Sequence, residues 1–238
     1  MLFRSKLETL VGMFGIGNLP TGDKDPFALR RHALGVIRIV VEKELPLDLS
    51  GLAACGTLAF RSLSVPNSTL QLMYKFFYDR FDGLLREQGF STQEIDAVLS
   101  QNPERLADVP KRLAAVRTFA ALPEAPALAA ANKRISNILK KEPTVDAHVS
   151  ELLLKEPAEI ALYSVMKQTV PAANAQFESG DYTASLQTLA VLRMPVDAFF
   201  DGVMVNAEEM DLRLNRQGLL KSLHDAMNRV ADLSKLAT

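Results

Sequence analysis

The sequence predicts an all-α fold, a helical bundle of about eight to ten helices. Apolar residues recur every three to four positions along most of the chain, which is the spacing of one helix face. Helix start and stop signals separate these stretches. Strand signals are scarce, because no stretch alternates apolar and polar residues between Asn-Gly or Asp-Gly turns.

The first hundred residues are expected to contain five helices. Asp25 and Pro26 start the second helix, as its N-cap and its first helical residue. Gly89 ends the fourth, and Ser91-Thr92-Gln93-Glu94 is a capping box for a short fifth helix. The expected ranges are about 3–14, 26–44, 49–63 and 67–88, with the fifth helix ending near 100.

The remainder of the chain continues the helical pattern. The composition changes around 45–50, where a basic helix gives way to a neutral one rich in small residues, and around 123–131, where the chain becomes Ala-rich. We therefore place a domain boundary near 46–65 and treat the rest as one helical unit. Its helices are expected near 103–121, 124–141, 157–179, 181–194, 196–205 and 207–236.

The composition excludes several classes of protein. Of 238 residues, 48% are hydrophobic and 23% charged, which is typical of a globular chain. Lys plus Arg is 27 against 28 for Asp plus Glu, which excludes a strongly basic, histone-like binder but not a local basic patch. The single Cys55 excludes an intramolecular disulfide and a Cys-based zinc site. With no long apolar run and no signal peptide, we expect a cytoplasmic protein without a membrane partner.

Two weak motifs are more simply explained as structural. Residues 17–24 nearly spell a phosphate-binding loop, but Asp23 separates the second Gly from the Lys, and the loop follows a helix rather than a strand. His224-Asp225 resembles the dipeptide of metal-dependent phosphohydrolases, yet the other two histidines are not at ligand spacing. We expect neither a catalytic residue nor a metal site.

The segment 127–141 is locally basic and contains no acid. At about 100° per residue, its apolar side chains fall in one arc. The opposite arc could bind phosphates or could be an ordinary solvated face. The apolar arc holds Leu128, Ala131, Ile135, Ile138 and Leu139, and the polar arc holds Lys133, Arg134, Asn137, Lys140 and Lys141.

Two further segments offer candidate contacts to nucleic acid. The segment 26–43 carries an excess of positive charge that includes Arg30 and Arg31. The aromatic helix at 67–88 places Tyr78 at the edge of its apolar stripe, beside Arg80. Such an edge could stack unpaired bases, or it could simply fill the core.

The segment 196–211 is acidic and contains no base. In the helix that follows it, Arg216 falls in the apolar arc, where a buried guanidinium needs a partner. We therefore expect Arg216 to form a structural ion pair with Asp197 or Asp201. Arg213 lies nearer the edge of the same face and is freer to bind a ligand.

Three segments in this order resemble one family, the β subunit of bacterial tetrameric glycyl-tRNA synthetases. They are Asp23–Arg31, Ala131–Leu139, and Val196–Val205 leading into Arg213–Arg216. Each segment is weak alone, and the order makes them specific. The resemblance covers essentially the whole chain and corresponds to the C-terminal third of that subunit. Asn206 and Glu209 depart from the family pattern.

The resemblance implies a tRNA-binding, non-catalytic part of glycine–tRNA ligase. Residues 1–60 would be the last helices of an HD-like domain, and 61–238 a helical anticodon-binding domain of the arginyl-tRNA-synthetase-like (DALR) type, with its core at about 130–236. The α subunit of an α₂β₂ tetramer would carry the class II catalytic core and use ATP and Mg. The partner would be tRNA(Gly), with no DNA.

With that function, the candidate tRNA contacts span several segments of the chain. Two alternatives remain open: a helical module that assembles the synthetase without touching RNA, and a stand-alone metal phosphohydrolase. The candidate contacts are Lys133, Arg134, Asn137, Lys140, Arg80, Tyr78, Arg30, Arg31 and Arg213.

Overall fold

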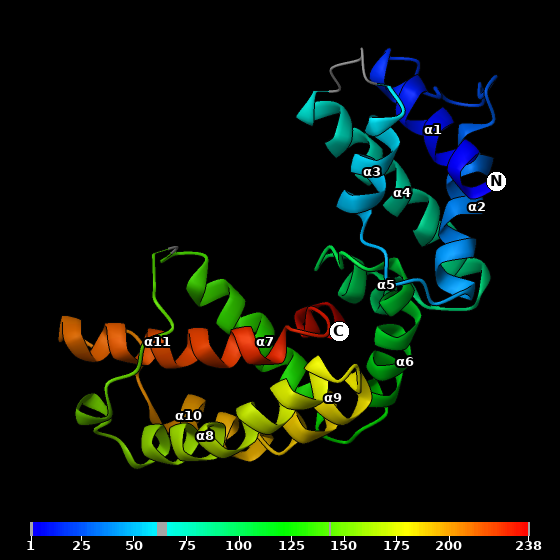
Figure 1. Ribbon diagram of the computed structural model, residues 1–238. Coiled ribbons are helices and arrows are strands. Elements are labelled where there is room, and N and C mark those ends of the chain that lie inside the picture. Colours follow the sequence, from blue (N-terminus) through cyan, green and yellow to red (C-terminus); the bar gives the residue numbers. More distant parts are fainter. Residues whose placement is uncertain (1, 61–65, 143, 238) are drawn as a thin grey trace. The chain divides into compact units, whose positions relative to one another are not determined.

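The computed structural model describes residues 2–60, 66–142 and 144–237 (Figure 1). Within these residues it contains eleven α-helices, three short 3₁₀ helices and no strand. The all-α prediction is confirmed. None of these helices is long and apolar enough to cross a membrane.

The chain divides into two compact units. The first comprises residues 1–95 and 102–111, and the second comprises 96–101 and 112–238. Residues 67–87 belong to the first unit because their helix packs against the helices at 2–15 and 29–42 of that unit. The predicted boundary at residue 60 separates the HD-like helices from the anticodon-binding domain. It stays a prediction.

The first unit packs four long helices around an apolar core. They are α1 (Leu2–Gly15), α2 (Leu29–Glu42), α3 (Leu49–Leu58) and α4 (Asn67–Glu87). Helix α1 packs against α2 and α3, and α4 packs against α2. The small residues of α3 permit a close approach, since a Cβ at Gly56 would lie 2.4 Å from a Val11 methyl.

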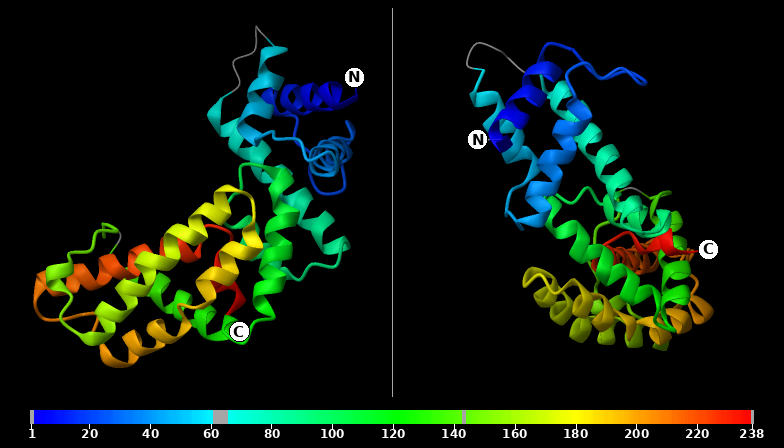
Figure 2. Two further views of the ribbon diagram at one scale, coloured as in Figure 1. Left: turned by 60° about the horizontal axis from the view of Figure 1, so that its bottom comes forward. Right: turned by 90° about the vertical axis from the view of Figure 1, so that its right-hand side faces the viewer.

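The second unit is a helical bundle in which α8 (Pro157–Glu178) and α9 (Tyr182–Ala190) form a hairpin (Figure 2). Helix α11 (Met210–Met227) packs against α8 and α7 (Ala125–Leu139), and α10 (Arg193–Gly202) packs against the same two helices. The 3₁₀ helices η2 (Glu151–Leu153) and η3 (Leu233–Leu236) contact α11 and α7, respectively.

Between α4 and α7 along the chain lie α5 (Thr92–Leu99), the 3₁₀ helix η1 (Leu106–Asp108) and α6 (Val109–Ala120). The capping box that starts α5 is confirmed, because the Ser91 N–H donates to the Glu94 carboxylate at 2.7 Å and the Glu94 N–H to the Ser91 hydroxyl at 3.2 Å. Gly89 ends α4 in the left-handed region, as predicted, with φ of 83°.

Some predicted helix starts are wrong by one to two turns. Helix α2 begins at Leu29 rather than Pro26, although the Asp25 carboxylate still accepts the Leu29 and Arg30 N–H groups, at 2.7 and 3.0 Å. The helix predicted from residue 103 starts at Val109, because the preceding backbone pairs with residues 48 and 49.

Other predicted ends are also displaced. Pro195 lies in the first turn of α10 instead of between two helices, since a first-turn residue needs no helical N–H partner. The helix predicted over 207–236 divides into α11 and η3, because the Asn228 side chain accepts the Leu233 N–H at 3.0 Å. Helix α3 ends at Leu58, and residues 61–63 of the predicted range lie outside the described residues.

Candidate nucleic-acid interface

Helix α7 carries the basic face that the sequence predicts. Its apolar arc points inward, with Leu128, Ala131 and Ile135 buried. The polar arc is exposed: Lys133, Arg134, Asn137, Lys140 and Lys141 all lie at the surface. Among the described residues, none of these four cations forms an ion pair with an acid. The face is therefore available to an anionic ligand.

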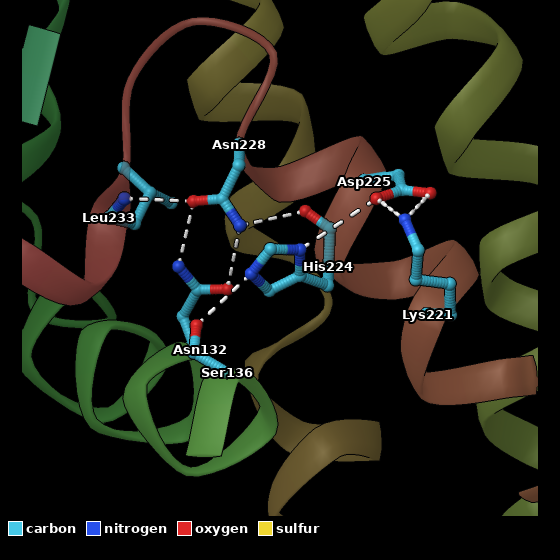
Figure 3. A network of polar contacts seen from close by, with 7 residues as sticks. All are labelled: Asn132, Ser136, Lys221, His224, Asp225, Asn228 and Leu233. Atoms are coloured by element: carbon cyan, nitrogen blue, oxygen red, sulfur yellow. Dashed lines mark hydrogen bonds and ion pairs between the residues drawn. The ribbon is translucent and has the colours of Figure 1, made fainter. Parts of the chain in front are cut away.

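A polar network holds the inner side of α7 against α11 (Figure 3). Asn132 and Asn228 exchange two amide hydrogen bonds, of 2.8 and 3.0 Å, and both residues are buried. One turn further along α7, the Ser136 hydroxyl lies 3.0 Å from Nε2 of His224. Because amide pairs of this kind have strict geometry, the network fixes the rotation of α7 about its axis.

His224 belongs to this structural network. Burial lowers the pKa of its imidazole below the usual value. Its Nδ1 lies 3.7 Å from the Asp225 carboxylate, which instead binds Lys221 at 2.6 Å. Within the described ranges, no three His, Cys, Asp or Glu residues are grouped so as to hold a metal ion.

A pocket of about 650 Å³ lies beside the basic face of α7. Helix α11 supplies a second wall, and the α10–α11 connection supplies a third. The spacing of the α7 residues, mostly three or four apart, places them on one flank of that helix. The lining residues are Ala130, Lys133, Arg134, Asn137, Ile138, Lys141 and Glu142 from the α7 region, Asn206 from the connection, and Arg213 and Gln217 from α11.

The pocket is strongly cationic. Lys133, Arg134, Lys141 and Arg213 line it, against the single carboxylate of Glu142. The Arg134 guanidinium lies over the Phe200 ring, 4.2 Å from its centroid, which orients this cation at the pocket wall. Arg213 is partly buried and contacts the Met210 sulfur at 3.0 Å. Several cations that converge on one concavity attract a phosphate-bearing ligand.

The sequence prediction for Arg216 was right about burial and wrong about the partner. Arg216 is buried and pairs with Glu159 of α8, whose side chain is fully buried. Asp197 instead pairs with Arg193 at 3.4 Å, and Asp201 is exposed. The sequence argument considered only nearby acids, whereas the fold brings in an acid 57 positions away.

The Arg216–Glu159 pair organises one side of the bundle. The other Glu159 oxygen accepts the Lys155 and Glu156 N–H groups at 2.7 and 2.8 Å, as part of the α8 capping box. A second guanidinium nitrogen of Arg216 donates to the Met204 carbonyl at 2.8 Å. The pair therefore ties the α10–α11 connection, which carries Asn206, to α8.

The remaining predicted contacts lie elsewhere. Arg30, Arg31, Tyr78 and Arg80 belong to the first unit. Arg30 donates to the Gly22 carbonyl, and Arg31 is exposed. The Tyr78 hydroxyl donates to the Pro103 carbonyl at 3.1 Å, and the Arg80 guanidinium lies 5.4 Å from the Phe76 ring centroid.

The residues that line the pocket differ in part from the contacts that the sequence analysis chose. Lys140 is exposed but does not line the pocket, whereas its neighbour Lys141 does. Asn206 and Gln217 line the pocket and were not among the predicted contacts. Gln217 lies one helical turn after Arg213. Because residues four apart are neighbours on a helix surface, the predicted contact at Arg213 could have been extended to Gln217.

Comparisons with known proteins first define the class. Residues 128–236, which include most of α7, the whole of α11 and every residue that lines the pocket, match the family model described as a DALR anticodon binding domain. Residues 128–236 of the second unit are therefore a helical anticodon-binding domain of the DALR class. Residues 3–100 match a second family model, described as the glycyl-tRNA synthetase β subunit.

Full-length relatives identify the family. The chain is 75% identical over 232 residues to the glycine–tRNA ligase β subunit of Polaromonas naphthalenivorans, covering 97% of this chain and 32% of that protein. Identity is 70% to the corresponding subunit of an Acidovorax species and 63% to that of a Janthinobacterium species, each over 98% of this chain. The chain belongs to the glycyl-tRNA synthetase β-subunit family, and it spans about a third of the length of these relatives.

Proposed function

We propose that this chain is the tRNA-binding, anticodon-recognition part of a glycine–tRNA ligase β subunit. The observation that carries the proposal is the cationic pocket between α7 and α11, which falls inside the region that matches the anticodon-binding domain. Lys133, Arg134 and Arg213 would contact phosphates of the anticodon arm, and Asn137 would add a hydrogen bond. Lys140 would contact a phosphate beside the pocket.

The same proposal extends to the rest of the ligase. The partner would be the α subunit in an α₂β₂ assembly in the cytoplasm, and the ligase would attach glycine to tRNA(Gly). ATP and Mg would be used through the α subunit, and no catalytic residue is proposed in this chain. Arg30, Arg31, Tyr78 and Arg80 would be secondary contacts to the tRNA, on a unit whose family match ends at residue 100.

The proposal is tested by measuring tRNA(Gly) affinity of the 238-residue chain against salt concentration. Each phosphate contact adds about 0.7–0.9 to the slope of log K against log salt. We expect Lys133→Gln, Arg134→Gln and Arg213→Gln together to weaken binding and to lower the slope by about two to three.

A matched control removes the same charge elsewhere. Lys75, Lys155 and Lys235 are exposed and do not line the pocket, so their joint change to Gln should leave most of the slope intact. Equal effects of the two triple variants would remove the pocket from the interface. If the unaltered chain binds no tRNA(Gly), the helical assembly module becomes the better reading.

A further inference from the structure

The Gln217 side chain is nearly buried, and it lines the cationic pocket. Among the described residues, no protein group forms a hydrogen bond with its amide, in contrast to the two polar residues that precede it. The fully enclosed polar atoms without a partner lie on other residues, so the amide of Gln217 keeps contact with the solvent of the pocket. Asn215 bonds to the backbone of Ser150 at 2.7 and 3.2 Å, and Arg216 binds Glu159 and the Met204 carbonyl.

An amide that lines a pocket without a protein partner is available to a ligand. Water can satisfy its hydrogen bonds in the free protein, and a ligand with matching polar groups can replace that water. A side-chain amide offers two N–H donors and one carbonyl acceptor on a single plane, which suits the edge of a nucleobase.

The pocket around Gln217 suits a nucleotide. Its volume of about 650 Å³ lies within the usual range of small-ligand sites. Arg213, one turn earlier on α11, is more exposed than Gln217, so cation and amide lie at different depths along one helix. Asn206 contributes a second amide, and Ala130 and Ile138 add apolar surface for a base. Phosphate binding at the cations would place an attached base toward the buried amide.

We propose that the Gln217 amide reads the edge of one unpaired base of the anticodon loop, inserted into this pocket. This inference rests on the proposed function, and it adds a specificity-determining residue to it. The lysines and arginines supply affinity that does not depend on sequence, whereas Gln217 supplies the discrimination between bases.

The experiment uses the 238-residue chain and a set of anticodon stem-loop RNAs of tRNA(Gly). In each RNA, one loop base is replaced. The variant is Gln217→Leu, which keeps the side-chain volume and removes the hydrogen bonds, and Gln217→Glu keeps the shape but removes the N–H donors. The control is Gln168→Leu on the exposed face of α8. Circular dichroism and thermal melting verify that each variant is folded.

We expect the unaltered chain to discriminate at one loop position by roughly 5- to 150-fold, the usual range for a paired amide and base. Both Gln217 variants should lose that preference. The affinity of Gln217→Leu for RNA already replaced at that position should stay unchanged, whereas the added negative charge of Gln217→Glu should weaken the binding of every RNA. The Gln168 variant should behave like the unaltered chain.

Three other outcomes contradict the proposal. If Gln217→Leu weakens every RNA by the same factor, or changes none, the amide does not read a base. If the unaltered chain binds all the stem-loops equally and in a salt-dependent way, the proposed function survives and this inference fails. If it binds none, both fail.

Discussion

At the scale of single residues, the second unit contains a buried ion pair between Arg216 and Glu159. Both side chains are almost entirely removed from water, and both make further hydrogen bonds to the backbone. Removing one member of such a pair leaves an uncompensated buried charge, whereas removing both does not.

We therefore predict that Arg216→Met destabilises the second unit by about 3–5 kcal/mol. The double variant Arg216→Met with Glu159→Gln should recover part of this loss, because no unpaired charge remains. Urea unfolding followed by circular dichroism measures both. Lys167→Met is the control: it breaks a solvent-exposed pair with Glu151 and should change the free energy of unfolding far less. A loss for Arg216→Met as small as that of the control would refute the prediction.

The residue scale also shows where sequence reasoning stops. The apolar arc of α11 correctly predicts that Arg216 is buried and needs an acid. Its partner could not be predicted, because Glu159 lies on a different helix and reads in the sequence as an ordinary first-turn acid. Gln217 was missed although it lies one turn after Arg213, because the pattern of the helix does not show which of its polar side chains line a pocket.

At the scale of elements, α7 has an inner side that packs against α11 and an outer side that is exposed and cationic. The inner side carries Asn132 and Ser136, which bind α11, and the outer side carries the cations and Asn137. Helical periodicity alone predicted this division correctly. The positions of α11 and of the α10–α11 connection were not predictable in the same way, because the side chain of Asn228 and the buried ion pair set them.

Two asparagines on α7 should accordingly differ in what they affect. Asn132→Ala should cost about 1–3 kcal/mol in unfolding free energy, because it leaves part of the buried Asn228 amide unsatisfied. Asn137→Ala should change stability by less than about 0.5 kcal/mol, since it is exposed, yet it should weaken tRNA binding.

Urea titration and tRNA binding, both performed on each variant, verify this separation. If Asn137→Ala destabilised the fold and Asn132→Ala did not, the side of α7 that carries Asn132 would not be the side that packs against α11.

At the scale of the whole molecule, the chain has two cores rather than one. Each unit buries its own apolar side chains, such as Leu10 and Ile37 in the first and Leu186 and Leu219 in the second. The sequence predicted the helical class and most of the helices. The boundary that it predicts near residue 60 stays a prediction. The membership of residues 67–87 in the first unit follows from packing between helices distant in sequence, which the sequence pattern does not show.

Damage to the first core should therefore leave the second one intact. Gly56→Ala places a methyl 2.4 Å from Val11 and should destabilise the first unit by about 1–3 kcal/mol. Gly83→Ala, on α4, meets no atom within 4 Å and should stabilise it by about 0.5–1 kcal/mol.

Hydrogen exchange, measured segment by segment, tests this prediction. Protection should fall in α1 and α3 of the Gly56 variant and stay unchanged in α8 and α11. A uniform loss of protection along the chain would mean that the two cores unfold as one.

The stacking of Arg134 on Phe200 has a consequence for how tightly a polyanion can be held. When a long cationic side chain becomes immobile at an interface, the loss of rotamer entropy costs about 0.5–1.5 kcal/mol of binding free energy. The aromatic ring restrains this guanidinium while the chain folds, so much of that loss precedes the encounter with RNA. Part of the entropic cost of association is thus already met within the free protein.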